Sequence, residues 1–103
     1  MRQLRVLMHG TPAGVLEEIE PGRSYRFSYD PGYTGSPISL TMPVQDDVFE
    51  FDRFPPFFDG LLPEGGMLKA LLQQAKLDAR DYMGQLLAVG ADLVGAVTIE
   101  ETR

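Results

Sequence analysis

The stretch LRVLMHGTPAGVLEEIEPGRSYRFSYD, residues 4–30, contains three runs in which apolar and polar residues alternate. Alternation with a period of two is typical of strands that bury one face. Turns are predicted at residues 9–12, with the sequence HGTP, and at residues 21–22, with the sequence PG. Because connections this short join antiparallel neighbours, the stretch predicts three antiparallel strands. In the third, Tyr25, Phe27 and Tyr29 share one face.

Two further strands are predicted downstream. The sequence PISLTMPV, residues 37–44, alternates so that Ile38, Leu40 and Met42 share one face, which predicts a fourth strand. The sequence GAVTIE, residues 95–100, predicts a last strand near the end of the chain.

The region between these strands has the periodicity of helices. Pro55 and Pro56 suit a helix start, and the apolar face of this short helix consists of Phe57, Phe58, Leu61 and Leu62. A second helix is predicted from an apolar stripe made of Leu68, Leu71, Leu72 and Ala75. For a third helix we expect Asp78 as the N-cap, Gly90 as the C-terminal stop, and a buried side made of Tyr82, Met83, Leu86, Leu87 and Val89. The predicted fold class is therefore α+β. We expect a small, mostly antiparallel sheet of about five strands with two to three helices, in one domain over residues 1–103.

Composition excludes several kinds of function. The chain has 103 residues, 44% of them hydrophobic, which suits one globular domain with one core. It has no cysteine, so disulfides and thiolate zinc sites are excluded. The net charge of -6 and the scattered basic residues argue against direct nucleic-acid binding. No apolar run suits a signal peptide or a membrane span, so we expect a soluble, cytoplasmic protein without membrane contact.

Three parts of the sequence contain residue types that occur in catalytic or cofactor sites. The glycine spacing from Gly60 to Gly65 matches a phosphate-binding loop, but Gly66 and Met67 follow where that motif needs Lys and Ser or Thr. The signatures of a complete protein kinase are missing as well. The sequence therefore predicts no nucleotide site in this segment.

The other two possibilities are an acidic loop and a histidine. The carboxylates of Asp46, Asp47, Glu50 and Asp52 could bind a hard cation, but their spacing matches no defined metal loop, and a solvated acidic loop is favoured. His9 could act as a general base, but no nucleophile or orienting acid lies near it in the sequence, and a turn residue is favoured. We expect no catalytic residues, no cofactor and no metal.

Three motifs in order give the chain a family resemblance. They are SPISLTMP at residues 36–43, FFDGLLPEG at residues 57–65 and QLLAVGADLVGAV at residues 85–97. Together they resemble the amino-terminal subdomain of HipA-type serine/threonine kinases, over nearly the whole chain. The third motif matches residue by residue at Leu86, Leu87, Ala88, Val89, Gly90, Asp92, Gly95, Ala96 and Val97.

The resemblance implies a binding role rather than catalysis. A HipA-like kinase continues into a large body that carries its ATP-binding and catalytic residues, whereas this sequence ends at Arg103. It resembles the small HipS-like protein of tripartite HipBST toxin–antitoxin systems, in which the kinase is shortened. The implied role is an antitoxin that binds and inhibits a HipA-like (HipT-like) Ser/Thr kinase toxin, alongside a HipB-like DNA-binding protein.

Two alternatives stay open at this stage. The chain could be an activating or scaffolding N-terminal subunit, or an excised subdomain, of a HipA-type kinase. It could also be an independent enzyme that uses the acidic loop and His9.

The expected partner-binding residues lie between the first two predicted helices. They are Leu62, Pro63, Glu64, Gly65, Gly66 and Met67. Backbone N–H groups at a helix start lack intrahelical partners, and glycines permit close approach of another chain, so this turn is predicted to contact the kinase.

Overall fold

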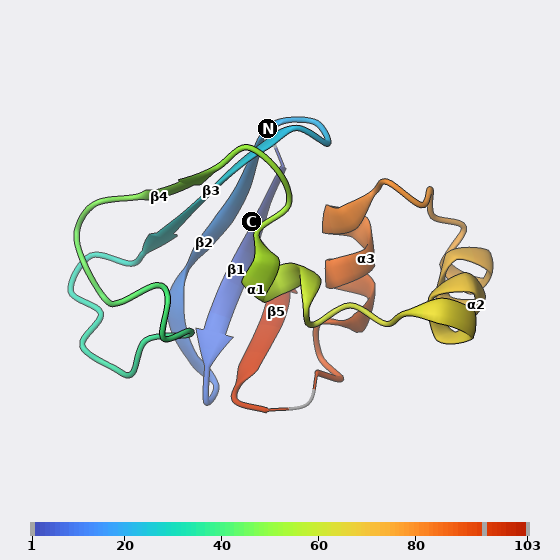
Figure 1. The fold of residues 1–103 in the computed structure, drawn as a ribbon. Coiled ribbons are helices and arrows are strands. Elements are labelled where there is room, and N and C mark those ends of the chain that lie inside the picture. The colour runs from blue at the N-terminus through green and yellow to red at the C-terminus, as the bar shows by residue number, and fades with distance from the viewer. Residues whose placement is uncertain (1, 94, 103) are drawn as a thin grey trace.

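The computed structural model describes residues 2–93 and 95–102, and within these residues it contains one sheet and three helices (Figure 1). Met1, Val94 and Arg103, which fall inside the predicted domain, lie outside the described residues. The elements in chain order are β1 (Arg2–Met8), β2 (Thr11–Glu20), β3 (Ser24–Tyr29), β4 (Phe49–Phe51), α1 (Pro56–Asp59), α2 (Gly65–Ala75), α3 (Tyr82–Val89) and β5 (Val97–Glu101). All pairings are antiparallel, in the order β4-β3-β2-β1-β5. The predicted α+β class is confirmed.

The first hairpin explains the position of His9. Met8 pairs with Thr11, so His9 and Gly10 are the two central residues of the turn. Both have positive φ, 51° for His9 and 80° for Gly10. Positive φ at both positions defines a type I′ turn, whose twist matches that of the flanking strands. The interpretation of His9 as a turn residue is therefore confirmed.

The core lies between the sheet and the helices. Phe27 is fully buried at its centre, with ring centroids 4.9 Å from Tyr29 and 5.9 Å from Phe58 of α1. Met83 and Leu86 of α3 are also fully buried and belong to the same apolar cluster. The predicted inner face of β3 is thus confirmed, and its aromatic rings are covered rather than free to stack on a ligand.

The predicted strand at residues 37–44 is wrong. Instead, Ser39 and Met42 close a turn, and the edge strand β4 forms later, at Phe49–Phe51. The Ser39 hydroxyl lies 2.9 Å from that of Thr41 and accepts from the Thr41 amide, so local side-chain bonds replace a sheet ladder. Ile38 and Met42 are buried as expected, but Leu40 points to solvent.

The N-cap of α3 also differs from the prediction. Asp81, not Asp78, caps the helix, and its carboxylate accepts from the Gly84 amide at 3.0 Å. Asp78 instead accepts from the Arg80 amide at 2.8 Å, which closes the preceding turn. An aspartate can form either local bond, so two aspartates three residues apart leave the helix start ambiguous in the sequence.

A carboxylate lies at one end of the inner face. The side chain of Glu18 is only 6% exposed, and it accepts from the Tyr25 hydroxyl at 3.4 Å and from the Gly22 amide at 3.3 Å. Burial, and secondly the charge of Glu18, raise the pKa of Tyr25 from 10.0 to about 12. The neutral phenol is therefore favoured in the folded protein.

The free energy of unfolding should fall as the pH rises from about 10 to about 12. In this window Tyr25 of the unfolded chain loses its proton while the folded protein retains it, so the unfolded state gains stability. Urea denaturation at pH 9, 10 and 11 should show a smaller loss for Tyr25→Phe than for the wild type. Equal losses in the two proteins would contradict this assignment.

Leu86→Ala should lower the free energy of unfolding by about 2–5 kcal/mol, because Leu86 is fully buried and truncation leaves a cavity. Leu71→Ala is the matched control. Leu71, which belongs to the predicted apolar stripe of α2, is only half-buried, so its truncation should cost clearly less. Urea denaturation measures the loss in free energy of unfolding for both variants. Equal losses would contradict the placement of α2 outside the core.

Candidate partner-binding surface

The segment after β4 forms α1 because of its two prolines. Pro56 occupies the first turn of the helix, where a missing N–H leaves no hydrogen bond unmade. The amide of Asp59 donates to the carbonyl of Pro55 at 2.9 Å, and the helix tightens at its end, where Leu62 donates to Asp59 at 3.1 Å. Pro63 cannot donate in turn, so the chain leaves the helix there.

Gly65 sets the direction of α2. Glu64, the N-cap residue, is extended, and Gly65 has a φ of +58°, which a side chain would make costly. Gly66 has no positive φ, and no atom lies within 4 Å of the position that a Cβ would take. The two glycines therefore differ: Gly65 is required by the backbone, whereas Gly66 leaves open space above the helix start.

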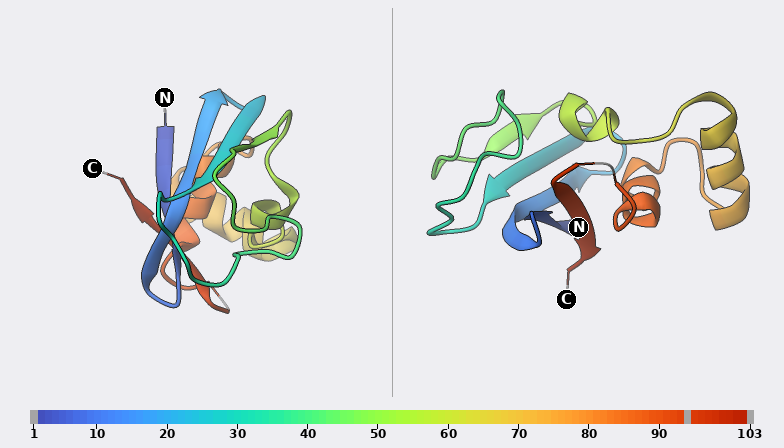
Figure 2. Two further views of the ribbon diagram at one scale, coloured as in Figure 1. Left: turned by 90° about the vertical axis from the view of Figure 1, so that its left-hand side faces the viewer. Right: turned by 90° about the horizontal axis from the view of Figure 1, so that it is seen from below.

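Helix α2 projects away from the sheet. None of its residues is buried, and in Figures 1 and 2 it lies beyond α3, at the end of the molecule opposite the loop that joins β3 to β4. Met67 has 76% of its surface exposed, while Leu68, Leu71 and Leu72 are half-buried. The predicted apolar stripe exists, but its own molecule covers only part of it.

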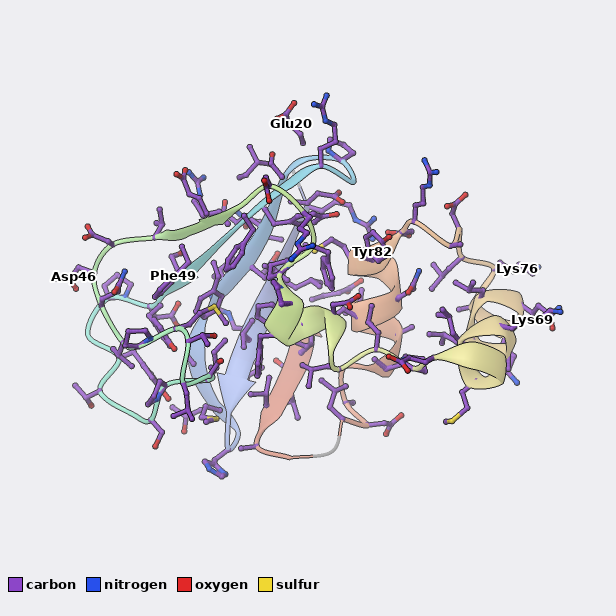
Figure 3. All side chains as sticks on the ribbon, in the orientation of Figure 1. Glu20, Asp46, Phe49, Lys69, Lys76 and Tyr82 are labelled. Atoms are coloured by element: carbon purple, nitrogen blue, oxygen red, sulfur yellow. The ribbon has the colours of Figure 1, made fainter. Side chains whose placement is uncertain are left out.

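An open groove runs along this stripe. Its volume is about 600 Å³, and its apolar lining comes from the α1–α2 turn, from α2 and from the chain after α3. Its apolar lining includes Leu61, Leu62, Pro63, Met67, Leu71 and Leu93. Lys69 of α2 and Lys76, the C-cap residue of this helix, lie at this end of the molecule, far from Asp46 at the other end (Figure 3).

Of the six predicted partner-binding residues, Leu62, Pro63 and Met67 line this groove, and Glu64, Gly65 and Gly66 lie between them in the chain. Leu62 and Pro63 are half-buried in its wall, whereas Glu64, Gly65, Gly66 and Met67 are exposed. Sequence reasoning missed the contribution of Leu71 and Leu93. The four-residue spacing from Met67 to Leu71 indicates a shared helix face, but nothing local indicates that Leu93 completes the groove.

The other candidate sites do not assemble. Among the described residues, no group of three or more His, Asp or Glu side chains is placed to hold a metal ion. Glu50 of β4 lies opposite Arg26 of β3 in the strand register, and the amide of His9 donates to the carbonyl of Ala96, next to β5. Within residues 2–93 and 95–102, no helix is long and apolar enough to cross a membrane.

The sheet, the helical layer and the projecting α2 define a class of small α+β domain. The family model of the HipA N-terminal domain matches residues 4–100. The chain belongs to this family. Its fold is also similar to a solved structure of the N-terminal domain of HipA toxin, with a TM-score of 0.74 and 33% sequence identity over 100% of this chain and 96% of that one.

Two relatives place the domain in different contexts. An uncharacterized protein of Haemophilus influenzae is 34% identical over 103 residues, which cover 100% of this chain and 95% of the relative. A putative kinase of Sinorhizobium fredii is 31% identical over 106 residues, which cover 93% of this chain but only 26% of the kinase. The chain therefore spans nearly all of one relative and about a quarter of the other.

Proposed function

We propose that this chain is an antitoxin-like binding module that associates with and inhibits a shortened HipA-like Ser/Thr kinase. In this proposal the chain is not itself an enzyme. The kinase docks on the turn from Leu62 to Met67 and on the groove behind it. A HipB-like DNA-binding protein completes the complex, which acts in the cytoplasm.

The observation that carries the proposal is the incomplete burial of α2. An 11-residue helix without a side-chain N-cap is marginal in water, and here its apolar residues form one wall of an open groove. Open apolar grooves of this size typically receive a ligand or another chain. A helix laid into a groove, or a groove filled by a partner, is a common mode of protein recognition.

The relatives support a kinase as the partner. The same domain spans nearly all of one relative and only a quarter of a putative kinase. A domain that occurs both alone and joined to a kinase body suits a role in which the free form binds a kinase that lacks it. The groove is then the surface that the remainder of the kinase would cover.

The runner-up function is an activating or scaffolding subunit. It is favoured by the putative kinase of Sinorhizobium fredii, in which the domain forms part of the kinase chain. Inhibition and activation differ in the sign of the effect on phosphate transfer, so one experiment separates them.

Adding this chain to a shortened HipA-like kinase should lower the rate of phosphate transfer to zero or near zero at saturation. The measurement is incorporation of radiolabelled phosphate, from ATP, into kinase or substrate at increasing concentrations of the chain. The chain alone is the control, and it should transfer no phosphate, since it lacks the lysine and metal-binding acids of phosphoryl transfer. A rise in kinase activity would favour the activating function instead.

Gly66→Arg should weaken kinase binding by about 10-fold or more, because a long side chain would occupy the open space at the start of α2. Folding should be unaffected, since Gly66 has ordinary backbone geometry. Calorimetry gives the dissociation constant, and thermal unfolding checks the fold.

Gly66→Ala is the matched control for this variant. It removes the same glycine and slightly favours the helix, so binding should stay close to that of the wild type. Gly65 is unsuitable for the comparison because its positive φ couples any substitution to backbone strain. Normal folding and full binding by Gly66→Arg would show that the contact lies elsewhere.

A further inference from the structure

The turn at Ser39–Met42 displays a large apolar side chain to solvent. Leu40 has 97% of its surface exposed, more than any other large hydrophobic residue among those described. Single exposed leucines are ordinary on protein surfaces, and exposure alone indicates nothing. Leu40 differs from an ordinary exposed leucine because hydrogen bonds and core contacts hold the turn that carries it.

The turn is fixed at both ends by the core. The buried hydroxyl of Tyr29 accepts from the amide of Ile38 at 3.0 Å and donates to the carbonyl of Met42. The side chains of Ile38 and Met42, on either side, belong to the hydrophobic core. Hydrogen bonds of Ser39 to Thr41 and Met42 then close the tip. The backbone at Leu40 is therefore held in place, and its side chain cannot fold back into the core.

We propose that Leu40 is a docking anchor that enters an apolar pocket with a basic rim on the partner kinase. This contact is separate from the turn at residues 62–67, and it rests on the proposed function. Burying a leucine that is already fixed in its bound position gains the full benefit of apolar burial at little cost in chain entropy.

The charge of the chain segment that carries the turn indicates the chemistry of the pocket. Residues 27–52 contain five carboxylates and no Lys, Arg or His. Arg26 and Arg53 lie beside Glu50 and Asp52, so Asp46 and Asp47 are the acidic residues that a basic rim would meet. Among the described residues, only Asp30 of these five carboxylates forms a salt bridge, with Arg5 at 2.9 Å. Asp46, Asp47, Glu50 and Asp52 are exposed. An exposed apolar side chain on an acidic segment is complementary to an apolar pocket surrounded by Lys or Arg.

A kinase body is large enough to reach both surfaces. The longest extent of this chain is 39 Å, and the β3–β4 loop and α2 lie at its opposite ends (Figure 2). The unmatched three quarters of the putative kinase is about three times as long as this chain. A folded body of roughly 300 residues is about 50 Å across, so one partner can contact Leu40 and the α2 groove together.

The test measures kinase binding by Leu40 variants. Leu40→Ala should raise the dissociation constant roughly 10- to 30-fold, and Leu40→Asp should raise it further, while thermal unfolding stays unchanged because the side chain is exposed. Ile19→Ala is the matched control. Ile19 is another exposed apolar residue, on β2, and its truncation should leave the dissociation constant unchanged.

A second measurement tests the basic rim. The double variant Asp46→Asn with Asp47→Asn should bind with a slower association rate and a weaker dependence on salt than the wild type. Gly66→Arg, which acts at the other end of the molecule, should weaken binding and keep most of the wild-type salt dependence.

The outcomes separate this proposal from the proposed function. Wild-type affinity in both Leu40 variants would overturn the Leu40 anchor while the kinase complex stands. An unchanged salt dependence in the aspartate variant would overturn the basic rim. If the wild-type chain does not bind the kinase at all, the proposed function fails and the anchor fails with it.

Discussion

The fold depends on one close backbone contact, between Gly90 at the end of α3 and Ile99 in β5. The Ile99 amide donates to the Gly90 carbonyl at 3.0 Å, and a Cβ at position 90 would lie 2.5 Å from the Ile99 carbonyl oxygen. No other residue type fits. The contact ties the helical layer to the edge of the sheet, and it satisfies backbone groups that an edge strand would otherwise expose. It also orients α3 so that Met83 and Leu86 face the core.

The sequence predicted the elements whose signals are local. The alternation of apolar and polar residues predicted β1 to β3, and the prolines and apolar spacing predicted the helices. Gly90 was expected to end α3. The reason for that glycine was not predicted, because its φ is -57° and the requirement comes from β5, not from a left-handed cap. The prediction of a strand at residues 37–44 was wrong for a similar reason. Its alternation is real, but the side chain of Tyr29, which belongs to β3 and not to this stretch, holds those residues in a turn.

In the candidate site, too, local features could be predicted from the sequence and contacts between distant segments could not. The turn from Leu62 to Met67 could be predicted because prolines and glycines carry their conformational effects within a few residues. The groove could not, because Leu93 joins it through the path of the chain after α3. Nor could the sequence show that Leu71 is half-buried. A stripe of leucines at helical spacing looks the same whether its own core or another protein covers it.

The exposure of α2 follows from the size of the core. Residues of α1 and α3, together with Ile38 and Met42, pack against the inner face of the sheet, whereas no residue of α2 is buried. Helix α2 packs against α3 and lies beyond it, with its remaining apolar surface open to solvent (Figure 1). In a free chain this surface lowers solubility and adds no stability. Under the proposed function its burial becomes part of the binding free energy, and that gain is available only where the kinase body supplies the missing layer.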